Sequence, residues 1–99
     1  NALMSRTGIK RRGIHLAFEV EDQPGSIKTL VDIIRRYGGR MASIMSSYDR
    51  APQGARYVYI RAYQIDREKI TSMVEELQAA ARLRYLVDHR ENRREIFAA

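Results

Sequence analysis

The chain has 99 residues, 44% of them hydrophobic and 30% charged, and it contains no cysteine. This length allows one domain with a single modest core. The lack of cysteine excludes disulfides, a thiol nucleophile and a cysteine-ligated metal. No stretch approaches the roughly 20 apolar residues that a transmembrane helix needs. We therefore expect a cytoplasmic domain with no membrane partner.

The net charge of +6 is concentrated near the N-terminus. Residues 1–13 contain no acid, and their basic residues are Arg6, Lys10, Arg11 and Arg12. Such a run is more often solvated than bound to nucleic acid. The opening Asn1-Ala2 resembles the remnant of a cleaved tag, so we interpret the chain as a piece of a longer protein. We predict a tag remnant and basic linker over 1–13, a domain over 14–89 and a charged C-terminal tail over 90–99.

The first predicted elements are a strand in "GIHLAFEVED" (13–22) and a helix beyond a Pro-Gly corner. Alternate strand residues are apolar, which is typical of a half-buried strand: Ile14, Leu16, Phe18 and Val20. Beyond the corner, apolar residues recur at helical spacing: Ile27, Leu30, Val31, Ile34 and Tyr37. Gly38-Gly39 predicts the end of this helix.

The second half of the domain begins with a weaker strand over 40–48, which has Ala42, Ile44 and Ser46 on one face. Residues 55–64 alternate strongly, with one apolar face of Val58, Ile60 and Ala62. The opposite face of that strand carries Tyr57, Tyr59, Arg61 and Tyr63. Asp66 is placed to cap a second helix, whose apolar stripe is Ile70, Met73, Val74, Leu77 and Ala81. A last strand is predicted over 83–89.

The order strand–helix–strand–strand–helix–strand predicts an α+β fold. With two right-handed crossovers and a central hairpin, it gives a ferredoxin-like βαββαβ sandwich. We expect a four-stranded antiparallel sheet with both helices on one face. The other face then meets solvent or a partner.

That other face is rich in tyrosine and arginine, so it resembles a platform on which RNA bases stack. The RNA-recognition motif places stacking aromatics at two positions of its third strand, where this sequence has Ala55 and Ile60. A protein partner explains Tyr57, Tyr59, Arg61 and Tyr63 at least as well. We do not expect a nucleic-acid partner, but an RNA-recognition-like module remains the alternative.

Catalytic and metal chemistry find little support in the sequence. Phosphate chemistry at the first strand–helix corner needs an anion site, whereas Glu19, Glu21 and Asp22 repel anions. His15 and His89, with Asp88, could approach a metal at the ends of neighbouring strands, although such histidines are more often surface residues. We expect no enzyme, no metal and no cofactor.

The corner "EVEDQPGSIKTL" (19–30) allows two interpretations. Capping of the helix by Asp22 or Gln23, with Pro24 in the first turn, accounts for the residue types. The free helix amides at this end also suit the carboxylate of a small molecule. Asp22 could then receive an amino group, so an α-amino acid fits the same corner.

The segments "FEVEDQPGSIKTLVDII", "YGGRMASI" and "LRYLVDH" resemble the ACT domain, a small regulatory ligand-binding module. The resemblance covers residues 14–89, and the D-x-P-G corner is its most specific part. It implies an amino-acid-type ligand and side-by-side pairing of two copies, with ligand sites at their interface. Carried over by position, the ligand-binding residues are Asp22, Gln23, Pro24, Gly25, Ser26, Arg40 and Met41.

The preceding "LMSRTGIKRRGIH" is similar to the segment that joins CBS modules to an ACT domain in acetoin-utilization-type proteins. One position departs from the family pattern, because Arg40 stands where amino-acid-binding members often have asparagine. An arginine can hold a carboxylate with two hydrogen bonds, or it can mark a domain that only dimerises. In the second case the tyrosine face becomes part of an oligomer interface. We expect a regulatory domain that couples a metabolite to attached domains.

Overall fold

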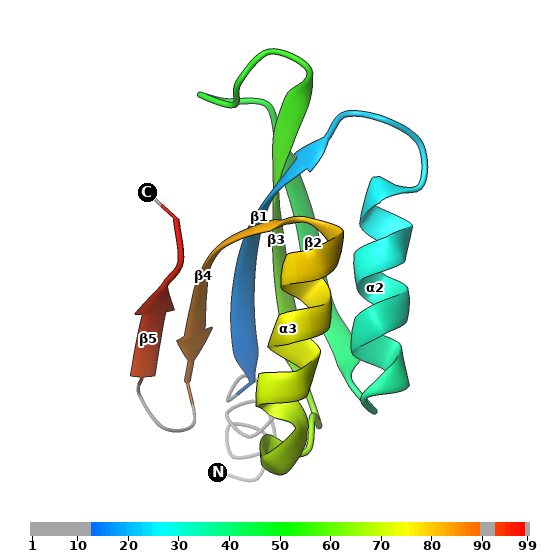
Figure 1. Ribbon diagram of the computed structural model, residues 1–99, viewed down its shortest axis with the longest axis vertical. Coiled ribbons are helices and arrows are strands. Elements are labelled where there is room, and N and C mark those ends of the chain that lie inside the picture. Colours follow the sequence, from blue (N-terminus) through cyan, green and yellow to red (C-terminus); the bar gives the residue numbers. More distant parts are fainter. Residues whose placement is uncertain (1–12, 90–92, 99) are drawn as a thin grey trace, which may run out of the picture.

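The computed structural model describes residues 13–89 and 93–98. Its elements are β1 (Ile14–Glu21), α2 (Ser26–Arg36), β2 (Arg40–Ser47), β3 (Ala55–Tyr63), the 3-10 turn η1 (Arg67–Lys69), α3 (Ile70–Ala80), β4 (Arg82–Asp88) and β5 (Arg93–Ile96). The strands form one antiparallel sheet in the order β2-β3-β1-β4-β5. Both helices lie on the same face of this sheet (Figure 1). The predicted α+β class with two helices on one face is thereby confirmed.

The core lies between the helices and the three inner strands, β3, β1 and β4. Alternation in β1 and β3 directs Leu16, Phe18, Val58 and Ile60 toward the helices, and all four are fully buried. The helices complete this core with Leu30, Ile34, Met73 and Leu77. Burial of each such side chain contributes about 1.5–3 kcal/mol of transfer free energy. The apolar faces that the sequence pattern predicts for the strands and helices are therefore the ones that stabilise their packing.

The sheet has five strands rather than the predicted four. The fifth, β5, falls within the segment predicted as a charged tail and pairs with β4 from Asp88↔Arg93 to Tyr85↔Ile96. All four β5 residues are exposed, and none belongs to the core cluster. The strand therefore owes its formation to backbone pairing along the edge of β4, which no apolar pattern signals.

Strand β2 departs from regular alternation near its start. Its pairing with β3 shifts between Met41 and Ser43, which is the effect of a β-bulge. Ile44 and Ser46 share the helix-facing side, as predicted, but Met41 takes the place expected for Ala42 and packs against the core. The bulge lets a large apolar side chain fill a position that alanine would leave open.

The helix caps differ from prediction at α2 and agree at the second helical segment. No side chain caps α2, and its N-cap is Gly25, with φ +88°. The interpretation in which Asp22 or Gln23 caps this helix is therefore wrong. Glycine reaches this left-handed conformation at little cost. Asp66 does act as an N-cap: its Oδ1 accepts a hydrogen bond from the Glu68 amide at 3.1 Å, opening η1 just before α3.

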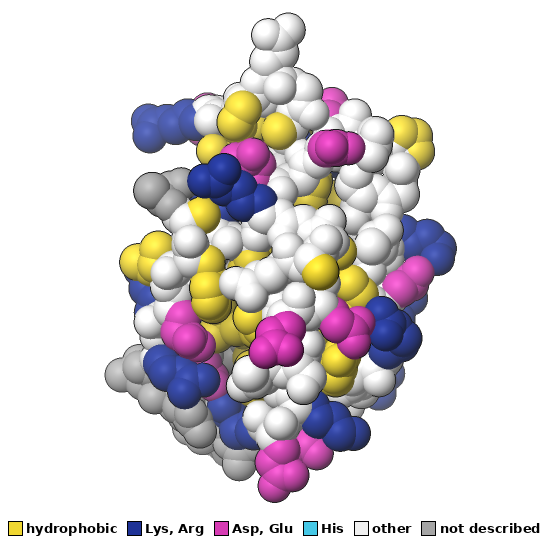
Figure 2. All heavy atoms as spheres, in the orientation of Figure 1, with side chains coloured by type: hydrophobic (Ala, Val, Ile, Leu, Met, Phe, Trp, Pro, Cys, Tyr) yellow, Lys and Arg dark blue, Asp and Glu magenta, His cyan; other side chains and the backbone are white. Residues whose placement is uncertain are grey.

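The helix-covered side presents a mixed surface. Figure 2 shows acidic and basic side chains interspersed over it, with hydrophobic side chains visible between them. Each α-helix has eleven residues, and no helix within the described residues is long and apolar enough to cross a membrane.

Candidate functional site

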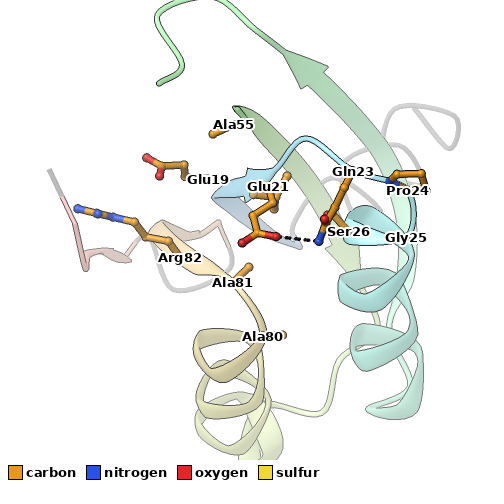
Figure 3. A pocket seen from close by; sticks show the side chains of 11 residues that line it. Glu19, Glu21, Gln23, Pro24, Gly25, Ser26, Ala55, Ala80, Ala81 and Arg82 are labelled. Atoms are coloured by element: carbon orange, nitrogen blue, oxygen red, sulfur yellow. Dashed lines mark hydrogen bonds between the residues drawn. The ribbon is translucent and has the colours of Figure 1, made fainter. Parts of the chain in front are cut away.

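A pocket of about 520 Å³ lies at the corner between β1 and α2. Its wall is formed by three segments far apart in the sequence: the end of β1 with the corner, the first residue of β3, and the junction of α3 with β4 (Figure 3). The lining residues are Glu19, Val20, Glu21, Gln23, Pro24, Gly25, Ser26, Ala55, Ala80, Ala81 and Arg82. The volume falls within the range of about 300–1,000 Å³ that is usual for small-molecule pockets.

The pocket exists because β1 extends further than β4. On one side, β1 pairs with β3 as far as Glu21↔Ala55. On the other side, its pairing with β4 ends at Glu19↔Arg82. The last two residues of β1 therefore border an open space on the β4 side. The small side chains of Ala80 and Ala81 keep this space from being filled.

The pocket contains charges of both signs. Glu19 and Glu21 place carboxylates at its wall, and Arg82 lines it from the start of β4, with its guanidinium directed away from α2 (Figure 3). Gln23 Nε2 donates a hydrogen bond of 2.7 Å to Glu21 Oε2, which orients that carboxylate. The first amides of α2 lie at the same corner, and helix-start amides attract anions. The arrangement suits a small zwitterion.

Four of the seven predicted ligand contacts line this pocket: Gln23, Pro24, Gly25 and Ser26. Asp22 does not line it. Its Oδ1 accepts a hydrogen bond from the Tyr48 hydroxyl at 3.0 Å and lies 3.6 Å from Arg56 Nε. These contacts turn the Asp22 carboxylate toward the β2–β3 side of the corner.

Arg40 and Met41 lie at the opposite end of the sheet. They pair with Tyr63 and Ala62, whereas the pocket borders the other end of β3 at Ala55. Eight residues of strand separate these ends, about 26 Å at the usual rise. Within one chain, the structure does not bring Arg40 or Met41 to the corner.

The predicted tyrosine-rich face is present on the side of the sheet away from the helices. Tyr57, Tyr59, Arg61 and Tyr63 alternate with the buried residues of β3. The Arg84 guanidinium lies over the Tyr57 ring, 4.1 Å from its centroid. Arg84 therefore covers one side of a ring that RNA bases would need for stacking.

His15 lies at the centre of this same face. Its ring is 6.5 Å from that of Tyr59 and 6.2 Å from that of Tyr85, both edge-on, and 6.3 Å from the stacked ring of His89. Burial lowers the pKa of His15 below its ordinary value of 6.5, and the positive charges of Arg61, His89 and Arg94 lower it further.

Asp88, the third member of the metal interpretation, does not join the histidines. It is fully buried, and its carboxylate forms an ion pair with Arg67. Among the described residues, no group of three or more metal-ligating side chains is found.

Sequence reasoning missed part of the pocket wall. It treated Glu19 and Glu21 only as charges that repel phosphate, it assigned Ala81 to the apolar stripe of the second helix, and it did not consider Ala80 or Arg82. No local signal marks these last three residues. Only the strand order, which sets β4 beside β1, predicts that the α3–β4 junction meets the corner.

Comparison with known proteins shows similarity at the level of fold. No protein-family model and no curated protein matches the sequence. Among solved structures, the chain is similar to one described as "GqqA- a novel type of quorum quenching acylases", with a TM-score of 0.56 and 16% sequence identity. The similarity covers 90% of this chain and 30% of that protein, so this chain spans less than a third of its neighbour's length. At this identity the likeness concerns the fold and transfers no activity.

Proposed function

We propose that the chain is a regulatory, non-catalytic domain of the ACT type, with a ferredoxin-like core, that binds an amino acid or related metabolite. One observation carries the proposal: the pocket lies at the D-x-P-G corner and is lined by the start of α2, two glutamates and one arginine. An α-amino acid presents a carboxylate and an ammonium group within a few ångströms of each other, which matches this pairing of charges.

In the proposed complex, the ligand carboxylate meets the first amides of α2. The Arg82 guanidinium, which is directed away from α2 in Figure 3, rotates toward that carboxylate. The ligand's ammonium group meets Glu21, whose carboxylate Gln23 already orients. Glu21 thus takes the role that the sequence suggested for Asp22, because Asp22 is directed toward Tyr48 and Arg56. The lining residues include no histidine, so the pocket lacks the usual general base of acyl transfer. We do not extend the acylase description of the structural neighbour to this chain.

The proposal includes pairing of two copies through β2. Among the described strands, β2 lies at the end of the sheet next to β3 alone, and it exposes Ile44 and Met45 to 43% and 65%. Antiparallel pairing of two β2 edges continues the sheet. It would also bring the partner's Arg40 to the Ser47 end of β2, beside Tyr48 and hence near Asp22. In the proposed dimer, the Arg40 of one copy and the Asp22 of the other contribute to the same site, whereas within one chain they do not.

A thermal-shift panel of the common amino acids, each at millimolar concentration, tests the ligand proposal. We expect at least one to raise the melting temperature, since binding to the folded state alone stabilises it. Glu21→Gln and Arg82→Ala should each weaken that ligand about tenfold or more, as expected for loss of a charge-assisted contact. Glu75→Gln, an exposed carboxylate on α3, is the matched control. Absence of any shift, or equal weakening by the control, would refute the proposal.

Asp22→Ala addresses the contribution of a second copy. If the ligand also reaches Asp22 through the paired edge, this variant should weaken binding only at protein concentrations where dimers form. Sedimentation velocity over a concentration series reports that state. Weakening that is equal in monomer and dimer would contradict the paired site.

The RNA-recognition-like alternative rests on the tyrosine face. It predicts salt-sensitive binding of a single-stranded RNA, lost when Tyr57 and Tyr59 become alanine. The amino-acid proposal predicts that these substitutions leave ligand binding at the corner unchanged, so the two functions are separated by the same pair of variants.

A further inference from the structure

An apolar row crosses the whole sheet on the face away from the helices. Strand register places one residue of each strand directly opposite the next, in the order Met45, Tyr59, Ala17, Tyr85 and Ile96. Met45 and Ile96, at the two ends, are 65% and 71% exposed, whereas Ala17 at the centre is fully buried. The row is therefore buried at its centre, and an aliphatic side chain is exposed to solvent at each end.

A cationic row runs beside it. The same register aligns Ser43, Arg61, His15, Val87 and Arg94 across the five strands. Arg61 and Arg94 lie on either side of His15, and both their charges act to lower its pKa. Arg84 and Arg40 add positive charge on this face. Among the described residues that the register assigns to this face, the carboxylates are those of Glu19 and Glu21, both at the end of β1 that borders the pocket.

The dimensions of the apolar row fit a segment of polypeptide. Five strands at the usual spacing span about 19 Å, which is the length of a helix of about 13 residues. Layered α+β domains bury each apolar face against another element, and neither described helix covers this one (Figure 1). A segment with one apolar stripe bordered by acidic residues would match both rows.

Two other occupants fit this face less well. A second copy would bring another set of Arg61, Arg84 and Arg94 side chains to a surface that holds few acids, and each chain already carries a net charge of +6. Single-stranded RNA would find Tyr57 covered by Arg84, and it would leave the exposed aliphatic side chains of Met45 and Ile96 without partners.

We propose that the face formed by these two rows is a docking surface for an acidic amphipathic helix of a partner protein. The partner's apolar stripe covers the Met45–Ile96 row, and its carboxylates meet Arg61 and Arg94. This inference does not rest on ligand binding at the corner, which lies at the end of the sheet and on a different set of residues.

The test uses a synthetic helical peptide of about 14 residues with a leucine stripe flanked by glutamates. A copy in which lysine replaces every glutamate, and a single-stranded oligouridylate, are the comparison probes. We expect the acidic peptide to bind and to shift backbone NMR signals of β3, β1, β4 and β5 on this face. Arg61→Glu with Arg94→Glu should weaken the acidic peptide about tenfold or more and improve the lysine peptide.

The matched control, Arg35→Glu with Lys69→Glu, makes the same change of net charge with exposed residues on the helix side. Arg94→Glu alone changes an exposed β5 position, so it does not disturb the central strands. This variant should give an intermediate loss of affinity for the acidic peptide. The proposal is overturned if the acidic peptide does not bind at 1 mM or binds no better than the lysine peptide. It is equally overturned if the control variant weakens binding as much, if the RNA binds more tightly, or if self-association covers this face.

Discussion

Arg67 and Asp88 form a bidentate ion pair that joins the turn before α3 to the last residue of β4. Asp88 is fully buried, and Arg67 retains 25% exposure of its side chain. The second hydrogen bond of the pair, from Arg67 Nη2 to Asp88 Oδ1, is 2.8 Å. The contact closes the end of the sheet where β1 begins, since Asp88 pairs with Ile14.

Substituting one member of this pair should lower the free energy of unfolding more than substituting both. Arg67→Met removes both charge-assisted hydrogen bonds that Arg67 donates to a buried carboxylate, and we expect the free energy of unfolding to fall by about 3 kcal/mol. The double variant Arg67→Met, Asp88→Asn removes the buried charge as well and should recover part of that loss. Urea denaturation of the three proteins measures the difference. A double variant less stable than Arg67→Met would contradict this account.

The His15 environment predicts a dependence of stability on pH. Because the pKa of His15 is lowered in the folded protein, the unfolded chain binds this proton more readily. Acidification below the ordinary pKa of about 6.5 therefore favours unfolding, while at higher pH the penalty is absent. We expect His15→Asn to lose less stability than the original chain between about pH 7.5 and 5.5. Parallel urea titrations measure this, and equal losses in the two proteins would disprove it.

The two helices are joined by a polar contact that should be visible in a carboxyl titration. Tyr37 donates a hydrogen bond of 2.5 Å to Glu76 Oε1, and Arg36 Nη2 lies 2.9 Å from Glu76 Oε2. The tyrosine hydrogen bond is the first cause of the lowered pKa of Glu76, and Arg36 lowers it as well through its hydrogen bond and its charge. Tyr37→Phe and Arg36→Gln should each raise that pKa toward its ordinary value. Carbon-13 NMR titration of the Glu76 carboxyl measures the change, and a pKa unaltered by either variant would count against the assignment.

Two glycines should differ in their sensitivity to alanine, for different physical reasons. At Gly25 an added Cβ meets nothing within 4 Å, and only the positive φ of 88° opposes it, which costs about 1 kcal/mol. At Gly39 a Cβ would lie 2.6 Å from Ile34 Cγ2 and 3.0 Å from Ile65 Cγ1, an overpacking worth about 2–3 kcal/mol. Thermal unfolding should therefore rank Gly39→Ala as the less stable variant. A larger loss at Gly25 would show that backbone strain outweighs the clash.

Local patterns predicted most of the fold because they report on burial. Leu16, Phe18, Val58 and Ile60 follow the period of a strand with one buried face, and they are buried as that period requires. The fifth strand has no such pattern, because it forms by pairing with β4 while its own side chains stay exposed. Its Ile96 gains no core contact that a sequence period could record.

The candidate site was predictable only in part, for a related reason. Gln23 to Ser26 carry a local corner signal, and they line the pocket. The direction of the Asp22 side chain depends on Tyr48 and Arg56, which arrive from β2 and β3. Arg82 reaches the pocket through the order of the strands. Contacts between distant segments decide these positions, and a single sequence does not record them.

Strand β1 extends two residues beyond its pairing with β4, and this extension bears on how ligand specificity could change. Beyond Glu19, the rim of the pocket on the β4 side is strand edge, and main-chain groups are present whatever side chains surround them. If the chain binds a metabolite as we propose, substitutions at Glu21 or Arg82 should alter which metabolite is preferred and leave this rim intact. Under that proposal, the capacity to hold a small polar molecule and the choice of that molecule depend on different groups, so related chains could change the choice without rebuilding the fold.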